Sequence, residues 1–209
     1  MNICFILDWR NILTDNFISR KYRIVSSAID LISESGLSAL TTHNLAMKEN
    51  TSEALMYKYF GSINEVLIEV VESYSNFDEG IRSTVRSKQT TYVNKLKEYF
   101  GAYATYYDNY YAIATIMLQY EELLHNIDTR ERIASCIKKR MDFLEELFSG
   151  AINNGEIIDL FTPYELANNI TGITMSHILS RRIEFRKKSF KQEFLDNINK
   201  WFDLLKVTN

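Results

Sequence analysis

The sequence predicts an all-α protein, and three observations lead to this class. Seven glycines and a single proline in 209 residues leave long stretches without the residues that favour turns. Apolar side chains recur at alternating steps of three and four residues along most of the chain, which is the spacing of one helix face. Short sequences that cap helices begin several of these stretches. With 46% hydrophobic residues, the chain can bury the cores of one small and one medium domain.

The first expected helix follows an N-terminal extension over residues 1–17. Apolar residues from Ile18 to Ile32 share one helix face, and Gly36 provides the left-handed residue that commonly ends a helix. Within the extension, Ile3–Leu7 is apolar, but it is too short to cross a bilayer and no basic leader precedes it. We interpret the extension as an arm that packs on the protein or contacts a partner.

Two short helices joined by a tight turn are predicted over Leu40–Phe60. A hydroxyl of the Thr41-Thr42 pair caps the first helix. Asn50 tolerates the left-handed backbone that ends this helix, and a hydroxyl of the Thr51-Ser52 pair caps the second. This arrangement is typical of a helix-turn-helix motif, in which the second helix reads DNA.

A larger set of residues around this motif has the spacing of a known family. These residues are Ala28, Gly36, Thr41, Thr42, Leu45, Ala46, Ser52, Met56, Tyr57, Tyr59, Phe60, Ser62, Glu65 and Leu67. The stretch from about Arg20 to Leu67 thereby resembles the DNA-binding domain of the TetR (tetracycline-repressor) family of bacterial transcriptional regulators. The resemblance implies a helix-turn-helix domain of three helices over residues 18–67, a linking helix over 62–75, and a helical ligand-binding and dimerisation domain over 76–209.

The function implied by the resemblance is that of a homodimeric repressor that a small-molecule effector releases from a palindromic DNA operator. Two departures from the family pattern concern DNA affinity. The chain has Asn50-Thr51 where the family commonly has Gly then Val, and Ile63 where it commonly has a Lys that binds a phosphate. Because acidic and basic residues balance in this region, we expect DNA binding that is weaker and strongly salt-dependent. The alternative is a helical ligand-binding or interaction protein that has lost sequence-specific DNA binding.

The resemblance also assigns roles to residues of the motif. The base-facing positions fall on His43, Glu53, Ala54 and Leu55, where Glu53 suits a cytosine amino group and Ala54 a thymine methyl group. An exposed acidic residue in the first turn of a helix is also ordinary, so Glu53 has a purely structural interpretation as well. The remaining DNA-binding candidates position phosphates or cap the second helix, and they are Thr41, Thr42, Ser52, Tyr57, Lys58 and Tyr59.

The rest of the chain is predicted to be helical as well, which gives about nine helices in all. Capping boxes begin at Ser62, Asp128, Thr162 and Ser189, the third of them with a proline at the first helical position. The polar run Ser75–Gln89 is the expected domain boundary, although part of it can continue the helix. The helices beyond the motif are predicted over residues 62–75, 91–108, 113–124, 128–153, 162–182 and 189–205.

Tyrosines are concentrated on one of these helices and are the most unusual feature of the composition. A tyrosine has an apolar ring and a polar hydroxyl, so several around one cavity would bind an aromatic or cationic small molecule. The same spacing also fits ordinary core packing. The ligand-binding candidates are Tyr99, Tyr103, Tyr106, Tyr107, Tyr110, Met117, His125 and Phe143.

Dimerisation is expected because two half-sites of a near-palindrome lie about 34–36 Å apart on B-DNA and need two DNA-binding domains. The last two long helices carry enough apolar side chains to form the interface, although these residues also suit the core of the single chain. The candidates are Ile170, Ile173, Ile178, Leu179, Phe194, Ile198, Trp201 and Phe202.

No residue group indicates catalysis, a cofactor or a metal. The sequence contains no nucleophile elbow, phosphate loop or metalloprotease motif, and neither His125 nor His177 has a second ligand at metal spacing. Cys4 and Cys136 lie far apart, which favours a reducing cytoplasm over a disulfide scaffold. The net charge of −3 gives no electrostatic indication of nucleic-acid binding. We therefore expect a cytoplasmic protein that is not an enzyme.

Overall fold

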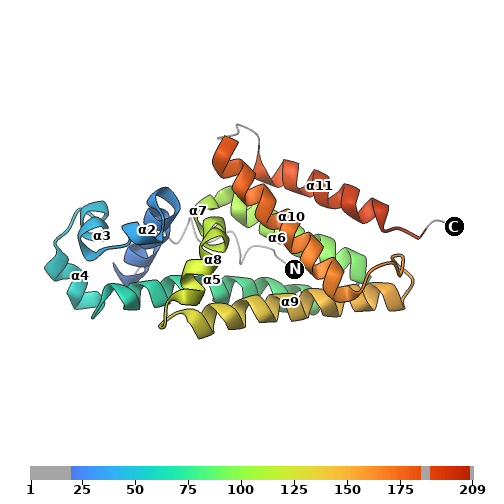
Figure 1. Cartoon of the computed structure of the whole chain (residues 1–209), viewed down its shortest axis with the longest axis horizontal. Coiled ribbons are helices and arrows are strands. Elements are labelled where there is room, and N and C mark those ends of the chain that lie inside the picture. The colour runs from blue at the N-terminus through green and yellow to red at the C-terminus, as the bar shows by residue number, and fades with distance from the viewer. Residues whose placement is uncertain (1–19, 185–188, 208–209) are drawn as a thin grey trace. The chain divides into compact units, whose positions relative to one another are not determined.

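The computed structural model describes residues 20–184 and 189–207, and within these ranges the chain is helical without any β-strand (Figure 1). The predicted N-terminal extension, the start of the first helix at Ile18, and Cys4 lie outside the described residues. The chain divides after Val70 into two compact units, the N-terminal unit and the C-terminal unit. Among the helices of the described ranges, none has a stretch long and apolar enough to span a bilayer.

The N-terminal unit contains the predicted helix-turn-helix motif. Thr41 caps α3 by accepting a hydrogen bond from the Asn44 amide, and Ser52 caps α4 by accepting one from the Leu55 amide. Asn50, between the two helices, has a φ of 49°, as the sequence predicted for a helix-ending residue. The elements of this unit are α2 (Arg20–Ser35), η2 (Leu37–Ala39), α3 (Thr42–Lys48), α4 (Glu53–Tyr59) and the first part of α5 (Ile63–Arg86).

A carboxylate at the end of α3 ties this helix to α2. The Glu49 side chain is only 8% exposed, and it accepts hydrogen bonds from the Ser27 hydroxyl at 2.5 Å and from Arg23 Nη2 at 3.4 Å. Arg20 Nε lies 3.9 Å from the same carboxylate. Because α3 has few buried residues of its own, these polar contacts fix its position in the unit.

Replacing Glu49 with alanine is therefore expected to destabilise the N-terminal unit by about 1–3 kcal/mol, because a part-buried hydroxyl and two arginines lose their acceptor. Urea denaturation followed by circular dichroism measures the change. Glu34→Ala is the matched control, since its pair with Lys48 is exposed and should contribute at most about 1 kcal/mol. Equal losses for the two variants would contradict this role of Glu49.

The C-terminal unit consists of the remainder of α5 and of the helices that follow it. Within this unit α9 packs against both α10 and α6, and α11 packs against α6. Buried aromatic side chains such as Phe143, Phe148 and Phe194 fill the space between these helices. The helices are α6 (Tyr92–Asn109), α7 (Tyr111–Ala114), η3 (Thr115–Gln119), α8 (Tyr120–His125), α9 (Arg130–Asn153), α10 (Pro163–Glu184) and α11 (Phe190–Leu204).

Two predicted boundaries differ from the structure. The helix expected to end near residue 75 continues to Arg86, because the polar run buries Ile81 and Val85 on its inner side. The single helix expected over 113–124 is divided into α7, η3 and α8. Thr115 contributes to this break, since its hydroxyl donates to the Ala112 carbonyl at 2.7 Å at the point where the 3-10 turn begins.

The predicted capping boxes have different outcomes. Thr162 and Glu165 exchange the two expected hydrogen bonds, and Ser189 accepts from the Gln192 amide as predicted. The box predicted at Asp128 is wrong: α9 has Thr129 as its N-cap, and the Thr129 hydroxyl donates to the Leu123 carbonyl instead of capping the helix. At the start of α5, the Glu65 amide donates to Ser62, whereas its carboxylate accepts from the Gly61 amide.

Asp108 joins the end of α6 to α10 and α11. Its carboxylate accepts hydrogen bonds from the Ser189 hydroxyl at 2.9 Å and from Arg181 Nη1 at 3.2 Å. Burial by itself would raise the pKa of Asp108, but these hydrogen bonds outweigh it and hold the pKa below the usual 3.8. The charged form is thus favoured in the folded state.

This pKa shift predicts a pH-dependent contribution to stability. Because the folded pKa lies below the unfolded one, the contribution is present above the ordinary pKa and is lost as the pH falls below 3.8. Asp108→Asn should therefore be less stable than the wild type at neutral pH. The difference in the free energy of unfolding should shrink below pH 3.8. Urea midpoints measured from neutral to acidic pH give the difference, with Asp142→Asn as the exposed control. A difference that is independent of pH would contradict the prediction.

Candidate functional site

The DNA-binding candidates lie on the outer sides of α3 and α4 in the N-terminal unit. Two contacts join the helices there: His43 Nδ1 lies 3.2 Å from Glu53 Oε1, and the Thr42 hydroxyl lies 3.5 Å from the Tyr57 hydroxyl. The structure thus brings these four predicted residues together on one surface. Thr42 and Leu55 are half-buried, and the exposed candidates are Thr41, His43, Ser52, Glu53, Ala54, Tyr57, Lys58 and Tyr59.

The charge of this surface is close to balanced. The His43 ring faces the carboxylate of Glu53, which is the one acidic residue of α4. Lys48 is paired with Glu34, and Lys21 is paired with Glu69 while also lying over the Phe60 ring. These pairs leave hydroxyl groups and Lys58 as the groups on α4 that suit phosphate oxygens.

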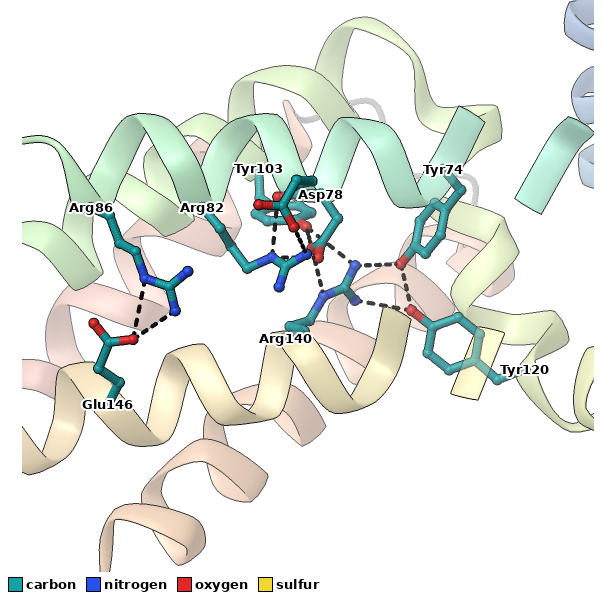
Figure 2. A network of polar contacts seen from close by, with 9 residues as sticks. Tyr74, Asp78, Arg82, Arg86, Tyr103, Tyr120, Arg140 and Glu146 are labelled. Carbon is teal, nitrogen blue, oxygen red and sulfur yellow. Dashed lines mark hydrogen bonds and ion pairs between the residues drawn. The ribbon is translucent and has the colours of Figure 1, made fainter. Parts of the chain in front are cut away.

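The most unusual feature of the C-terminal unit is a buried polar network centred on Arg140 of α9 (Figure 2). Arg140 Nε donates to Asp78 of α5 at 2.9 Å, and its Nη2 donates to the Tyr74 hydroxyl at 2.8 Å and the Tyr103 hydroxyl at 3.2 Å. Its Nη1 donates to the Tyr120 hydroxyl at 3.0 Å. Side chains from α5, α6, α8 and α9 therefore converge on one guanidinium group.

Asp78 connects this network to a second arginine. Arg82 Nε lies 2.9 Å from the other oxygen of the Asp78 carboxylate, and the Tyr103 hydroxyl also donates to Asp78. Arg82 Nη2 also forms an ion pair with Glu79, whose side chain is 55% exposed. The Asp78 side chain itself is fully buried. The buried part of the network thus contains two guanidinium groups and one carboxylate.

The phenols around Arg140 stay neutral at physiological pH. Burial raises the pKa of Tyr74, Tyr103 and Tyr120 well above the usual value of 10.0. Burial by itself would lower the pKa of Arg140, but the surrounding phenol oxygens and Asp78 outweigh it and raise the pKa. Arg140 therefore stays charged: it is paired with Asp78, and the neutral phenols add only hydrogen bonds.

A small cavity of about 20 Å³ adjoins this network. Three of the predicted tyrosines line it, together with the predicted Met117 and with Arg140, which the sequence prediction did not include. The Tyr99 hydroxyl is buried without a hydrogen-bond partner among the described residues. The lining residues are Tyr99, Phe100, Tyr103, Tyr107, Met117, Arg140, Leu144, Thr171 and Thr174.

The other ligand-binding candidates lie elsewhere in the unit. Phe143 is buried beneath Tyr99, with ring centroids 5.3 Å apart, so it supports the cavity wall without lining it. Tyr106 and Tyr110 are half-buried and pack on each other, and Tyr106 also stacks on Phe77. His125 is exposed at the end of α8, where its ring contacts Glu121, and it does not line the cavity.

The candidates for the dimer interface are divided between the core and the surface. Ile173 and Trp201 are half-buried and Leu179 is 46% exposed, so these residues can bury further area against a partner. The exposed Ile183 extends the same helix surface. The remaining candidates fill the core of the chain itself, which is the alternative that the sequence left open, and they are Ile170, Ile178, Phe194, Ile198 and Phe202.

No group of three His, Cys, Asp or Glu residues within the described ranges is arranged to hold a metal ion. Cys136 lies buried on α9, and burial raises the pKa of its thiol.

Comparisons with known proteins relate this fold to bacterial regulators. The model of the bacterial regulatory proteins of the tetR family matches residues 24–70. The fatty acid metabolism regulator protein of Bacillus subtilis (strain 168) is 24% identical over 139 residues, which are 65% of this chain and 69% of that protein.

Two solved structures share the fold of nearly the whole chain. The ketosteroid transcriptional regulator KstR2 of Mycobacterium tuberculosis has a TM-score of 0.82 at 15% identity, with 91% of this chain and 96% of that chain covered. AibR in complex with isovaleryl coenzyme A and operator DNA has a TM-score of 0.72 at 20% identity, with 90% of this chain and 98% of that chain covered. The N-terminal unit thus matches the model of the tetR family of bacterial regulatory proteins, and nearly the whole chain has the fold of these two solved regulators.

Proposed function

We propose that this protein is a homodimeric repressor that binds a near-palindromic DNA operator and is released from it by a small-molecule effector. The observation that carries the proposal is the capped helix-turn-helix of α3 and α4, which lies within the family match and exposes polar side chains on both helices. A related fold, AibR, was crystallised with isovaleryl coenzyme A and operator DNA. The family model that matches the N-terminal unit is one of bacterial regulatory proteins, so we propose no catalytic role.

The proposed DNA contacts divide into two groups. Glu53, Ala54 and Leu55 at the start of α4 face the bases of the major groove, with His43 of α3 beside them. The hydroxyl groups of α3 and α4 and the Lys58 ammonium group bind phosphates. Because His43 contacts Glu53 in the free protein, these two side chains are already oriented toward the same part of the groove.

The proposed effector is an acyl compound that binds in the C-terminal unit. A relative of this chain is named a fatty acid metabolism regulator, and AibR binds an acyl coenzyme A. The tyrosine-lined cavity beside Arg140 is the proposed site. Binding there releases DNA only if the effector prefers the conformation of the dimer that does not fit the operator. We place the protein in the cytoplasm, where both DNA and acyl coenzyme A are found.

The experiment that tests this function measures DNA binding and release in one titration. The purified full chain is titrated onto fluorescently labelled duplexes from the region upstream of its own gene at about 50 mM and about 200 mM salt. We expect a specific complex of one dimer per operator that octanoyl coenzyme A dissociates. A protein that binds ligand but no duplex at either salt concentration would instead support a helical ligand-binding protein. Ile63, which lacks the charge of a lysine, and the acidic Glu53 both favour that function.

A further inference from the structure

The charge around Arg140 points to the chemical nature of the effector. The buried network contains the guanidinium groups of Arg82 and Arg140 but only one buried carboxylate, that of Asp78. Glu79 balances Arg82 from the protein surface. A buried charge is costly unless it is paired, and the neutral phenols around Arg140 supply only hydrogen bonds. Because Asp78 is shared between two guanidinium groups, the site favours a further accepting oxygen beside Arg140 and disfavours a cation.

The hydrogen-bonding capacity of the site is also incompletely used. A guanidinium group has five N–H donors, and the four hydrogen bonds of Arg140 leave one Nη1 donor without a partner among the described residues. The Tyr99 hydroxyl, on the same cavity, is buried and lacks a partner as well. Two donors at one cavity can thus bind an oxygen atom that the chain itself does not provide.

The remaining lining of the cavity suits an alkyl chain. Phe100, Met117 and Leu144 are buried apolar side chains that line the cavity together with Arg140. The cavity holds about 20 Å³, which is room for about one water molecule. An alkyl chain must therefore displace side chains such as those of Tyr103 and Met117. Methionine adapts easily to such changes because its side chain is unbranched and flexible.

We propose that Arg140 binds the oxygen head of the effector, and that this head is a carboxylate or a thioester carbonyl at the end of an alkyl chain. This inference rests on the proposed function only in taking the C-terminal unit as the effector site. Free fatty acids and acyl coenzyme A thioesters both present such an oxygen, and probes that differ only in the head group separate them.

The same geometry connects ligand binding to α5. Asp78 is held by Arg82 as well as by Arg140, so Arg140 can turn toward a ligand without leaving the Asp78 carboxylate unpaired. Turning would also break the hydrogen bond from Arg140 to Tyr74, which lies on α5 too. The oxygen head of the ligand thus competes with Asp78 and Tyr74 for the Arg140 guanidinium group. Both residues lie on α5, the helix that begins in the N-terminal unit.

The test uses four probes with the same eight-carbon chain: octanoate, octanoyl coenzyme A, 1-octanol and octylamine. Binding to the full chain is measured by isothermal titration calorimetry without DNA, so the result does not depend on operator binding. We expect octanoate or octanoyl coenzyme A to bind at least about 10-fold more tightly than octanol, because a hydrogen bond to a charged group discriminates by this amount. Octylamine should bind more weakly still.

Arg140→Met is the decisive variant, because it keeps an unbranched side chain of similar length and removes the charge. It should lower the affinity for the oxygen-headed probe by about 10- to 100-fold while changing the affinity for octanol little. If Arg140 has a purely structural role, Arg140→Met should lower the affinity for both probes by the same factor. Arg132→Met is the matched control, since Arg132 is also on α9 and binds a carboxylate of α5, Glu72, at 2.8 Å, but on the exposed surface.

Several results would overturn the inference. One is that octylamine binds as tightly as octanoate. Another is that the wild type and Arg140→Met have the same ratio of affinities for the oxygen-headed probe and octanol. If Arg140→Met does not fold, Arg140→Lys replaces it and should retain the preference for the acid at reduced affinity. Absence of binding by both oxygen-headed probes also overturns the inference. A protein that binds these probes as expected but never binds DNA would refute the proposed function and leave the role of Arg140 intact.

Discussion

Asp78→Ala is expected to lower the free energy of unfolding by about 3–5 kcal/mol, the loss typical of removing one partner of a buried ion pair. The Asp78 carboxylate is fully buried between Arg82 and Arg140 and accepts a further hydrogen bond from Tyr103. Without it, two guanidinium groups remain in the interior with no buried counter-charge. Their side chains are only 4% and 7% exposed, so water cannot replace the carboxylate without rearrangement.

Urea denaturation followed by far-ultraviolet circular dichroism measures this loss. Glu79→Ala is a strict control, because the neighbouring Glu79 binds the same Arg82 at 2.8 Å but has a side chain that is 55% exposed. This variant should lose at most about 1 kcal/mol. Asp78→Asn keeps an oxygen acceptor without the charge, so its loss of free energy of unfolding should lie between those of Asp78→Ala and Glu79→Ala. A loss below about 1 kcal/mol for Asp78→Ala would mean that the network is not essential for packing α5.

Lys58→Glu is expected to weaken operator binding by about 10- to 100-fold in the dimer, because attraction to a phosphate becomes a like-charge repulsion in each protomer. Lys58 is an exposed residue near the C-terminal end of α4, and it is the only basic residue of that helix. In a surface whose charges otherwise nearly balance, one ammonium group has a large share of the phosphate attraction. The folded state should be unaffected.

Fluorescence anisotropy at several salt concentrations tests the role of Lys58. The slope of the logarithm of affinity against the logarithm of salt concentration should decrease by about 0.9 for each phosphate that the variant no longer neutralises. Lys138→Glu changes the net charge equally, but Lys138 lies on α9 in an exposed pair with Asp142. This control should reduce affinity only slightly. If the two variants weaken binding equally, the effect is one of net charge, and Lys58 does not bind a phosphate itself.

The fold of the N-terminal unit could be predicted because its signals are local. Thr41 and Ser52 cap their helices from within three residues, and Asn50 adopts the left-handed backbone that the sequence indicated. Helix boundaries that depend on tertiary contacts were harder to predict. The polar run after Tyr74 looks like a linker in sequence, yet it is helical because Asp78 and Arg82 find partners in the interior.

The centre of the candidate effector site was missed for a physical reason. Apolar residues recur on one face of α9 through Ile133, Ile137, Met141, Leu144 and Phe148. An arginine, by contrast, is seldom buried. In the structure Cys136 and Arg140 are buried with Ile133, whereas Ile137 and Met141 are only half-buried. The spacing of Arg140 from Ile133 fits the stripe, so a charged residue at an apolar position was the available signal. Its partners lie on other helices and could not be assigned from spacing.

The spacing of the tyrosines alone did not separate core positions from cavity positions. Tyr99, Tyr103 and Tyr107 line the cavity, whereas Tyr106 packs against Phe77. The expectation of an aromatic or cationic ligand came from the ring chemistry of tyrosine. The unused donors of Arg140 and Tyr99 lead us to propose an oxygen-headed acyl ligand instead.

The most direct test of the central claim is selection of binding sites from random duplex DNA with the purified full chain, followed by the same selection with Glu53→Ala. The proposed function predicts an enriched near-palindrome whose half-sites lie about one helical turn apart. The Glu53→Ala protein should enrich a sequence with altered preference at the positions that Glu53 faces, while keeping the half-site spacing. If no sequence is enriched even at low salt, the protein is not a sequence-specific repressor, and its function lies in the ligand chemistry of the C-terminal unit.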